Sequence, residues 1–137
     1  MAAPPAVKAF LTADTVIQDR ATGKWTVVGV FDRIFAPVFP CVHPWVALYV
    51  RLSDAKGRYR VRIEVRDADD RLQARLEGLE FEAPDPRQAV EFGLVTQQLR
   101  LERPGPLQFQ LFLNEEMTAV ASLTAVEVKP GAPPPGP

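Results

Sequence analysis

The sequence predicts an all-β protein: an antiparallel two-sheet β-sandwich of the immunoglobulin-like type, with about eight strands. Hydrophobic and polar residues alternate with a period of two. The clearest case is RYRVRIEVR at residues 58–66, where apolar residues from Tyr59 to Val65 alternate with charged ones. Such alternation is typical of a strand with one buried face. Turn-forming residues interrupt the hydrophobic runs at short intervals, and no ten-residue window shows helical periodicity.

The predicted strands are the hydrophobic runs between clusters of Gly, Pro, Asn and Asp, which supply the backbone angles of tight turns. They cover residues 7–17, 24–31, 44–52, 58–66, 71–82, 89–95, 106–113 and 117–128. A β-bulge is predicted at Gly78, because the hydrophobic residues before and after it fall on opposite faces of one strand. The last strand has no clean alternation, so the sequence leaves its inward residues open.

Three prolines, Pro37, Pro40 and Pro44, argue against a central strand or a helix over residues 36–44. We therefore expect this segment to be an extended crossing from one sheet to the other. Its apolar side chains would close one end of the core, and they are Phe35, Val38 and Phe39.

A single domain is expected over residues 7–128, between a disordered N-terminal tail at 1–6 and a proline-rich tail at 129–137. The 16 basic and 17 acidic residues nearly cancel, so charge draws the chain neither to nucleic acid nor to a membrane. The single cysteine excludes an internal disulfide, and neither a secretory signal nor a membrane span is visible. These observations predict a cytoplasmic protein.

The order of local motifs resembles that of an uncharacterised family of small bacterial proteins. AFLTADTVIQDRATGKWTVVGVFDRIFAPVFPCVHPWVALYVRL contains an opening strand, a Thr-Gly-Lys turn, a Val-Gly-Val-Phe strand and a Phe-Pro crossing, and FGLVTQQLRLERPGPLQFQLFLNEE resembles the family's second half. The likeness spans most of residues 9–128. It implies a bacterial cytosolic β-sandwich, a domain of unknown function.

The densest group of reactive residue types surrounds Cys41 and His43, which point to the same side in an extended segment. If successive strands run up and down, several aspartates lie at the same end. The resulting polar end site comprises Asp32, Cys41, His43, Asp69 and Asp70. One Cys and one His are too few for a zinc site or for a nucleophile with its base and orienting group. We therefore predict no catalytic residue, no metal and no cofactor.

A second candidate is a face rich in arginine on two neighbouring predicted strands. It comprises Arg60, Arg62, Arg66, Arg71 and Arg75. A tight hairpin at residues 67–70 would place Arg66 opposite Arg71 and Arg62 opposite Arg75. Such a cluster could hold an anion. The alternative is a solvated face whose charges are balanced by Glu64, Glu77 and acids of a neighbouring strand.

The third candidate is the outer side of the central strand at 44–52, which is apolar on nearly both faces. If Val46 and Leu48 point to the core, then Trp45, Tyr49 and Arg51 point outward. The strand at 24–31 is similarly ambiguous, because apolar residues occur on both of its faces. Trp, Tyr and Arg are enriched at binding hot spots. Either this face contacts a partner, or the crossing or a tail covers it.

These observations predict a non-enzymatic protein-interaction or assembly module. The expected partner is another protein or a second copy in a homodimer, with no nucleic acid and no membrane. The alternative is a small-ligand-binding protein or an enzyme that uses the end loops around His43 and the turn of Asp67, Asp69 and Asp70.

Overall fold

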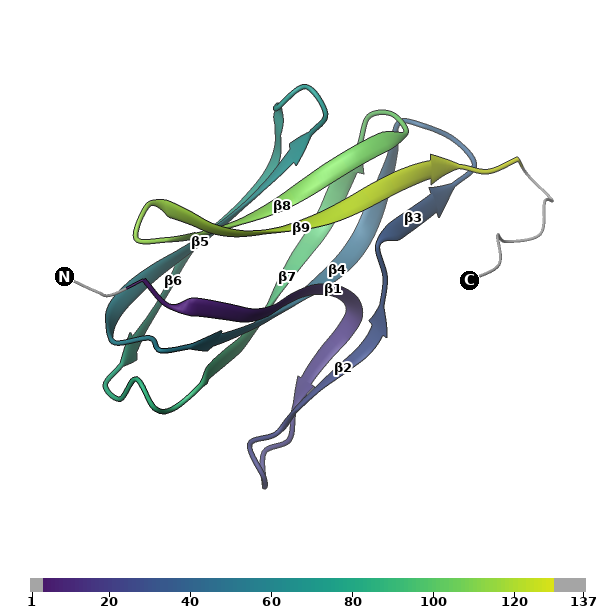
Figure 1. The fold of residues 1–137 in the computed structure, drawn as a ribbon. Coiled ribbons are helices and arrows are strands. Elements are labelled where there is room, and N and C mark those ends of the chain that lie inside the picture. The colour runs from purple at the N-terminus through teal and green to yellow at the C-terminus, as the bar shows by residue number, and fades with distance from the viewer. Residues whose placement is uncertain (1–3, 130–137) are drawn as a thin grey trace.

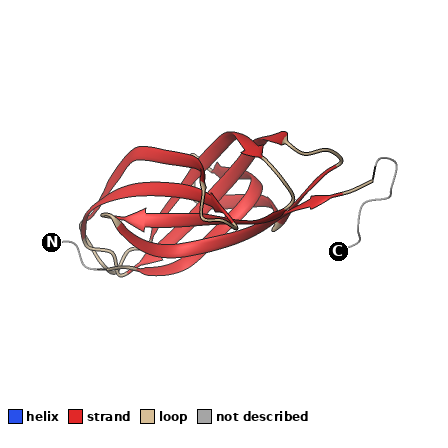
Figure 2. Cartoon of the chain, turned by 90° about the horizontal axis from the view of Figure 1, so that it is seen from above, coloured by secondary structure: helices blue, strands red, loops and turns tan. Residues whose placement is uncertain are grey.

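The computed structural model describes residues 4–129, and within them the chain forms strands and loops without a helix (Figure 1, Figure 2). The strands are β1 (Ala6–Gln18), β2 (Trp25–Val30), β3 (Arg33–Ala36), β4 (Cys41–Ser53), β5 (Gly57–Asp67), β6 (Leu72–Ala83), β7 (Val90–Leu101), β8 (Gly105–Leu113) and β9 (Glu116–Glu127). The predicted all-β class is confirmed. No helix among these residues is long and apolar enough to cross a membrane.

The strands form two sheets, ordered β2-β1-β4-β7 and β3-β9-β8-β5-β6. All pairs in the first sheet are antiparallel, but β3 runs parallel to β9 in the second. The expectation of wholly antiparallel sheets is therefore wrong at β3. The cause is the short link from β2 to β3, which takes the chain from the edge of one sheet directly to the edge of the other. The Thr124 N–H donates to the Asp32 carbonyl at 2.9 Å and holds this link in place.

The core lies between the sheets and consists of alternate residues of the central strands. Its largest fully buried apolar side chains include Phe109, Leu48, Leu52, Ile63, Leu99, Leu101, Leu111 and Leu123. Each such side chain contributes about 1.5–3 kcal/mol through burial. In β9, whose phase the sequence left open, Leu123 and Ala125 are buried, and Val120 faces solvent. The predicted alternation of β5 is confirmed, because Tyr59, Val61, Ile63 and Val65 are all buried.

The predicted bulge at Gly78 is also confirmed. The pairing of β5 with β6 shifts register between Val61 and Ile63, whose partners are Leu79 and Leu76. Between these pairs β6 has two residues where β5 has one, and Gly78 is one of the two. Its φ is 92°. Glycine adopts this left-handed conformation without the steric cost of a Cβ atom.

The crossing is shorter than predicted, because β3 ends at Ala36 and β4 already begins at Cys41. Pro44 therefore lies inside a strand. It is tolerated because β1 pairs with β4 only as far as Ala47, so the first part of β4 has a neighbour on the β7 side alone. A proline that faces an unpaired edge removes no ladder hydrogen bond.

The predicted tails lie largely outside the described residues. β1 begins at Ala6, within the segment expected to be an N-terminal tail. Of the proline-rich segment predicted at 129–137, only Lys129 is described.

Candidate protein-interaction surface

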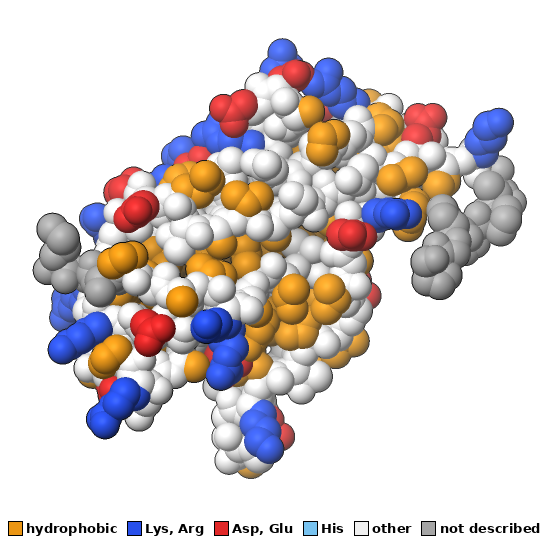
Figure 3. Space-filling view, in the orientation of Figure 1, with side chains coloured by type: hydrophobic (Ala, Val, Ile, Leu, Met, Phe, Trp, Pro, Cys, Tyr) orange, Lys and Arg blue, Asp and Glu red, His pale blue; other side chains and the backbone are white. Residues whose placement is uncertain are grey.

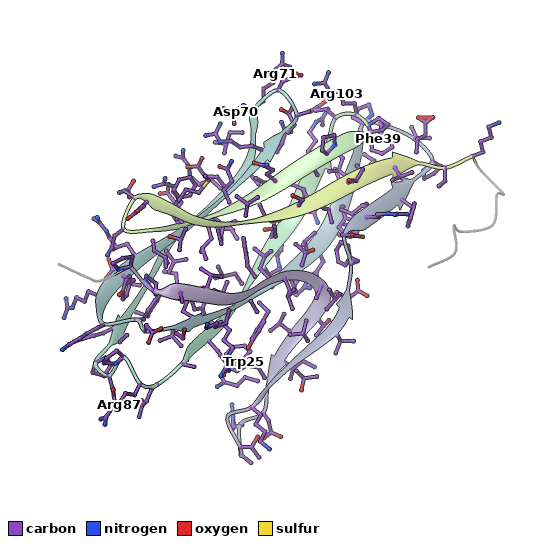
Figure 4. The ribbon with its side chains drawn as sticks, in the orientation of Figure 1. Trp25, Phe39, Asp70, Arg71, Arg87 and Arg103 are labelled. Atoms are coloured by element: carbon purple, nitrogen blue, oxygen red, sulfur yellow. The ribbon has the colours of Figure 1, made fainter. Side chains whose placement is uncertain are left out.

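The predicted polar end site does not form a single cluster. Asp70 and Arg103 lie at the same end of the molecule as Phe39 (Figure 4). However, the Asp69 carboxylate pairs with the Arg103 guanidinium, and the Asp70 carbonyl accepts a hydrogen bond from Arg66 at 2.9 Å. These polar groups are therefore engaged with arginine.

Of the other members of the predicted end site, Asp32 is exposed, and Cys41 and His43 are half-buried. The His43 ring packs against Phe31, with 6.2 Å between the ring centroids. Cys41 is half-buried against the hydrophobic core. Across residues 4–129, no three His, Cys, Asp or Glu side chains lie close enough together to hold a metal ion.

The arginine face is organised around Glu64, one of the acids that the alternative interpretation expected to balance its charges. Glu64 lies on the outer side of β5, and its side chain is only 5% exposed. Its Oε2 lies 2.8 Å from Arg62 Nε and 3.4 Å from Arg75 Nη2, and its Oε1 lies 2.7 Å from Arg66 Nη2. The signal was the alternation at residues 58–66, where Glu64 is the one acid in a row of arginines.

The predicted pairing of arginine with arginine is wrong, because bulges shift the hairpin register. Glu64 is opposite Arg75, and Arg66 is opposite Leu72. The turn is therefore one residue longer than predicted. Within it, Asp67 Oδ1 accepts hydrogen bonds from the backbone N–H groups of Asp69 and Arg71, both at 2.9 Å.

Further acids balance the rim of the arginine face. Glu115 pairs with Arg62 at 2.6 Å and Glu77 with Arg75 at 3.4 Å. Arg60 is exposed and opposite Glu80, and Arg71 is exposed at the turn. The Arg62 guanidinium also lies 4.2 Å from the centre of the Phe112 ring.

This arrangement determines the ionisation of Glu64. Burial raises the pKa of its carboxyl group, whereas the hydrogen bond and charge of Arg66 and the charges of Arg62 and Arg75 lower it. The arginines prevail, so the pKa of Glu64 lies below its ordinary value. The cluster is therefore a set of mutually neutralised charges.

The predicted face on β4 is only partly exposed. Trp45 is 43% exposed, and the Arg51 side chain is 45% exposed, but Tyr49 is only 8% exposed. The Tyr49 hydroxyl donates to Glu91, which also pairs with Arg51 at 3.0 Å. Burial raises the pKa of Tyr49, and the hydrogen bond to Glu91 adds to the effect. The exposed part of this face therefore reduces to Trp45 and Arg51.

The β1–β2 hairpin covers Tyr49, a contact that the sequence did not suggest. β1 bends sharply after the part that pairs with β4, and its second half pairs with β2 (Figure 1). Trp25 then packs on Tyr49 with 6.1 Å between ring centroids. A Cβ atom at Gly93 would lie 3.1 Å from Val16 and 3.2 Å from Trp25, so the absence of a side chain there admits the hairpin. Figure 4 labels Trp25.

The opposite side of the hairpin faces solvent and carries exposed hydrophobic residues beside Thr15 and Thr26. The exposed fractions are 50% for Ile17, 46% for Val28 and 59% for Val30. Phe35 in β3 and Val38 in the crossing are also exposed. The prediction that these two side chains close one end of the core is therefore wrong, whereas Phe39 does pack against the core. In Figure 3, hydrophobic side chains gather over the hairpin bend and near β3. We call this set of five residues, Ile17, Val28, Val30, Phe35 and Val38, the edge strip.

The sequence contained a partial signal for the edge strip. β2 is apolar on both faces, and a two-layer core can bury only one of them. The structure resolves the ambiguity: Trp25 and Val27 are partly buried, whereas Val28 and Val30 are exposed.

The sequence of this chain matches a known protein family. A family of unknown function, DUF6941, matches residues 8–126. The chain belongs to this family. The match confirms the resemblance to an uncharacterised domain, while bacterial origin stays a prediction.

Two further comparisons concern curated proteins and solved structures. No curated protein matches the chain in sequence. A similar fold occurs in the Pseudomonas fluorescens alkylpurine DNA glycosylase AlkC, in a complex with DNA containing an abasic site analog, with a TM-score of 0.58 and 10% sequence identity. The match covers 90% of this chain and 30% of the glycosylase chain. At this identity, the likeness shows the fold alone.

Proposed function

We propose that this DUF6941 domain is a non-enzymatic protein-interaction module, built on an immunoglobulin-like sandwich and acting in the cytoplasm. The observation that carries the proposal is the edge strip. Its side chains are branched aliphatic or aromatic, and each is at least two-fifths exposed. Exposed apolar surface commonly marks a contact with another macromolecule, and here it gathers in two groups, over the hairpin bend and near β3 (Figure 3).

The pairing of carboxylates with arginines supports a binding role over an enzymatic one. Glu64 is held by three arginines, and Asp69 by Arg103. Catalytic acids and bases need a free site for the substrate and a pKa suited to proton transfer. The end loops around His43 form the alternative site, but no observation favours a reaction there.

The charge distribution supports a protein as the partner. The formal net charge is −1, and the arginines of the second sheet are balanced by acids on the same face. Nucleic-acid binding depends on uncompensated Lys and Arg that displace counterions from phosphates. The DNA in the glycosylase complex belongs to that protein and carries no implication for this chain.

Affinity retention from an extract of the producing cells tests the proposal. The bait is the full chain, and the edge variant combines Val28→Lys with Val30→Lys. Leu72→Lys is the matched control, since Leu72 is 43% exposed on β6, away from the edge strip. We expect proteins retained by wild type and by the control to be lost with the edge variant. Equal retention by all three folded proteins would contradict the proposal.

A further inference from the structure

The four sheet edges of this fold differ in how well they are protected. β6 and β7 lie beside one another, with 5.6 Å between the rings of Phe81 and Phe92. β6 also carries charged side chains and the bulge at Gly78. β3 is only four residues long and is followed by Pro37. Charges, bulges and short length are the usual means of preventing edge-to-edge pairing.

The remaining edge, β2, lacks most of this protection. Its sequence, WTVVGV, contains neither a charge nor a proline, and its one irregularity is Gly29, with a φ of 71°. β1 occupies one side of β2, and no strand among residues 4–129 occupies the other. The free side thus presents backbone donors and acceptors to a further strand.

We propose that β2 pairs antiparallel with β2 of a second copy of this chain, about a two-fold axis at Val28. The inference rests on the proposed function and names the partner of the edge strip. In this register Val28 faces Val28 of the second copy, and Thr26 faces Val30. These side chains are exposed in the single chain, and pairs of β-branched residues stabilise adjacent strands.

Charge complementarity selects this register. Lys24 and Asp32 flank β2, four residues to either side of Val28, so the two-fold axis brings Lys24 of each copy toward Asp32 of the other. Both residues are exposed, and neither forms an ion pair within residues 4–129. Shifting the axis by one residue to Val27 would place Lys24 opposite Val30 and lose both ion pairs.

The dimer would also extend the fold without changing it. Each first sheet ends at β2, so pairing joins the two four-stranded sheets into one continuous sheet. Symmetric contacts of this kind close on themselves, which limits assembly to two copies.

Reversing the charge of Lys24 or Asp32 tests the proposal. The oligomeric state is measured by light scattering coupled to size-exclusion chromatography over a range of protein concentrations. Lys24→Asp gives a chain with acids at both positions, and Asp32→Lys gives a chain with lysines at both. We expect wild type to dimerise and each variant alone to bind itself roughly tenfold or more weakly, because like charges then face each other twice. An equimolar mixture of the two variants should restore dimers, since every facing pair is again opposite in charge.

Two controls separate the possible failures. Lys8→Asp reverses an exposed charge away from the axis and should dimerise as wild type does. Val28→Lys should be monomeric. A wild type that stays monomeric at all concentrations, or a Val28→Lys variant that still dimerises, overturns the self-pairing. Neither result affects the proposed function, which is judged by whether the edge variant loses proteins that wild type retains from the extract.

Discussion

Glu64 is a nearly buried carboxylate on the outer side of a sheet, a position where most charged side chains are solvated. Three arginine side chains cover it, so its charge is compensated by contacts at 2.7, 2.8 and 3.4 Å. A charge that has lost its water needs such partners, since an unpaired buried charge costs several kcal/mol. The three arginines in turn depend on Glu64 to reduce their mutual repulsion.

We predict that Glu64→Gln lowers the free energy of unfolding by about 1–3 kcal/mol, because charge-assisted hydrogen bonds are replaced by weaker neutral ones. Urea denaturation at neutral pH measures the change. Glu77→Gln is the control on the neighbouring strand, where the ion pair is largely exposed, and it should cost under about 0.5 kcal/mol. Equal losses in both variants would contradict the central role of Glu64.

The lowered pKa of Glu64 also predicts how stability depends on pH. A carboxyl group whose pKa is lower in the folded than in the unfolded chain stabilises the fold above its ordinary pKa of 4.5. That contribution is lost as the pH falls from this value through the folded pKa. We therefore expect wild type to lose more stability than Glu64→Gln below pH 4.5, as measured by urea denaturation across this range. Parallel curves for the two proteins would show that Glu64 does not titrate in this way.

At the scale of elements, the β1–β2 hairpin is the feature that decides which surface is free. It bends at the facing positions Asp14 and Gly29, where a Cβ on Gly29 would collide with the Asp14 carboxylate. One face of the hairpin then covers Tyr49, and the other becomes part of the edge strip. The contact at Gly93 is what allows this close approach.

We predict that Gly93→Val lifts the hairpin and destabilises the protein by about 1 kcal/mol or more, because the added side chain overlaps Val16 and Trp25. Fluorescence of Trp25, measured in a Trp45→Phe background, should shift to the red as the ring becomes solvated. Gln97→Val is the control, since it places the same side chain at an exposed position of the same strand. An unshifted spectrum for Gly93→Val would contradict this account of the hairpin contact.

Sequence periodicity predicted the long strands because one face of each is buried, as in β5. It missed β3, whose four residues are too few to show alternation. It also misplaced the register of the β5–β6 hairpin. The register shifts between Val65 and Arg66, where the sequence has no glycine to indicate a bulge as Gly78 does. Long-range packing was likewise invisible: the contact of Trp25 with Tyr49 depends on a bend that no local pattern specifies.

At the scale of the whole molecule, near-neutral charge and the paired acids and arginines leave apolar surface as the main feature available for recognition. The sequence located part of that surface at Trp45, but the larger part lies on β2 and β3. That part could not be assigned from the sequence, because a strand is an edge only by virtue of the neighbours that the fold gives it. β2 has an exposed apolar face and a free edge together, and this coincidence underlies both proposals.

Amide hydrogen exchange of the wild-type chain, followed by mass spectrometry at low and high protein concentration, tests the central claim most directly. Unpaired edge amides exchange quickly and become protected when another strand pairs with them. We predict that exchange in residues 25–30 slows as concentration rises, while exchange in residues 58–66 on the arginine face stays unchanged. Exchange in residues 25–30 that is the same at every concentration, or protection that appears on the arginine face instead, would contradict the claim that β2 is the surface through which this chain associates.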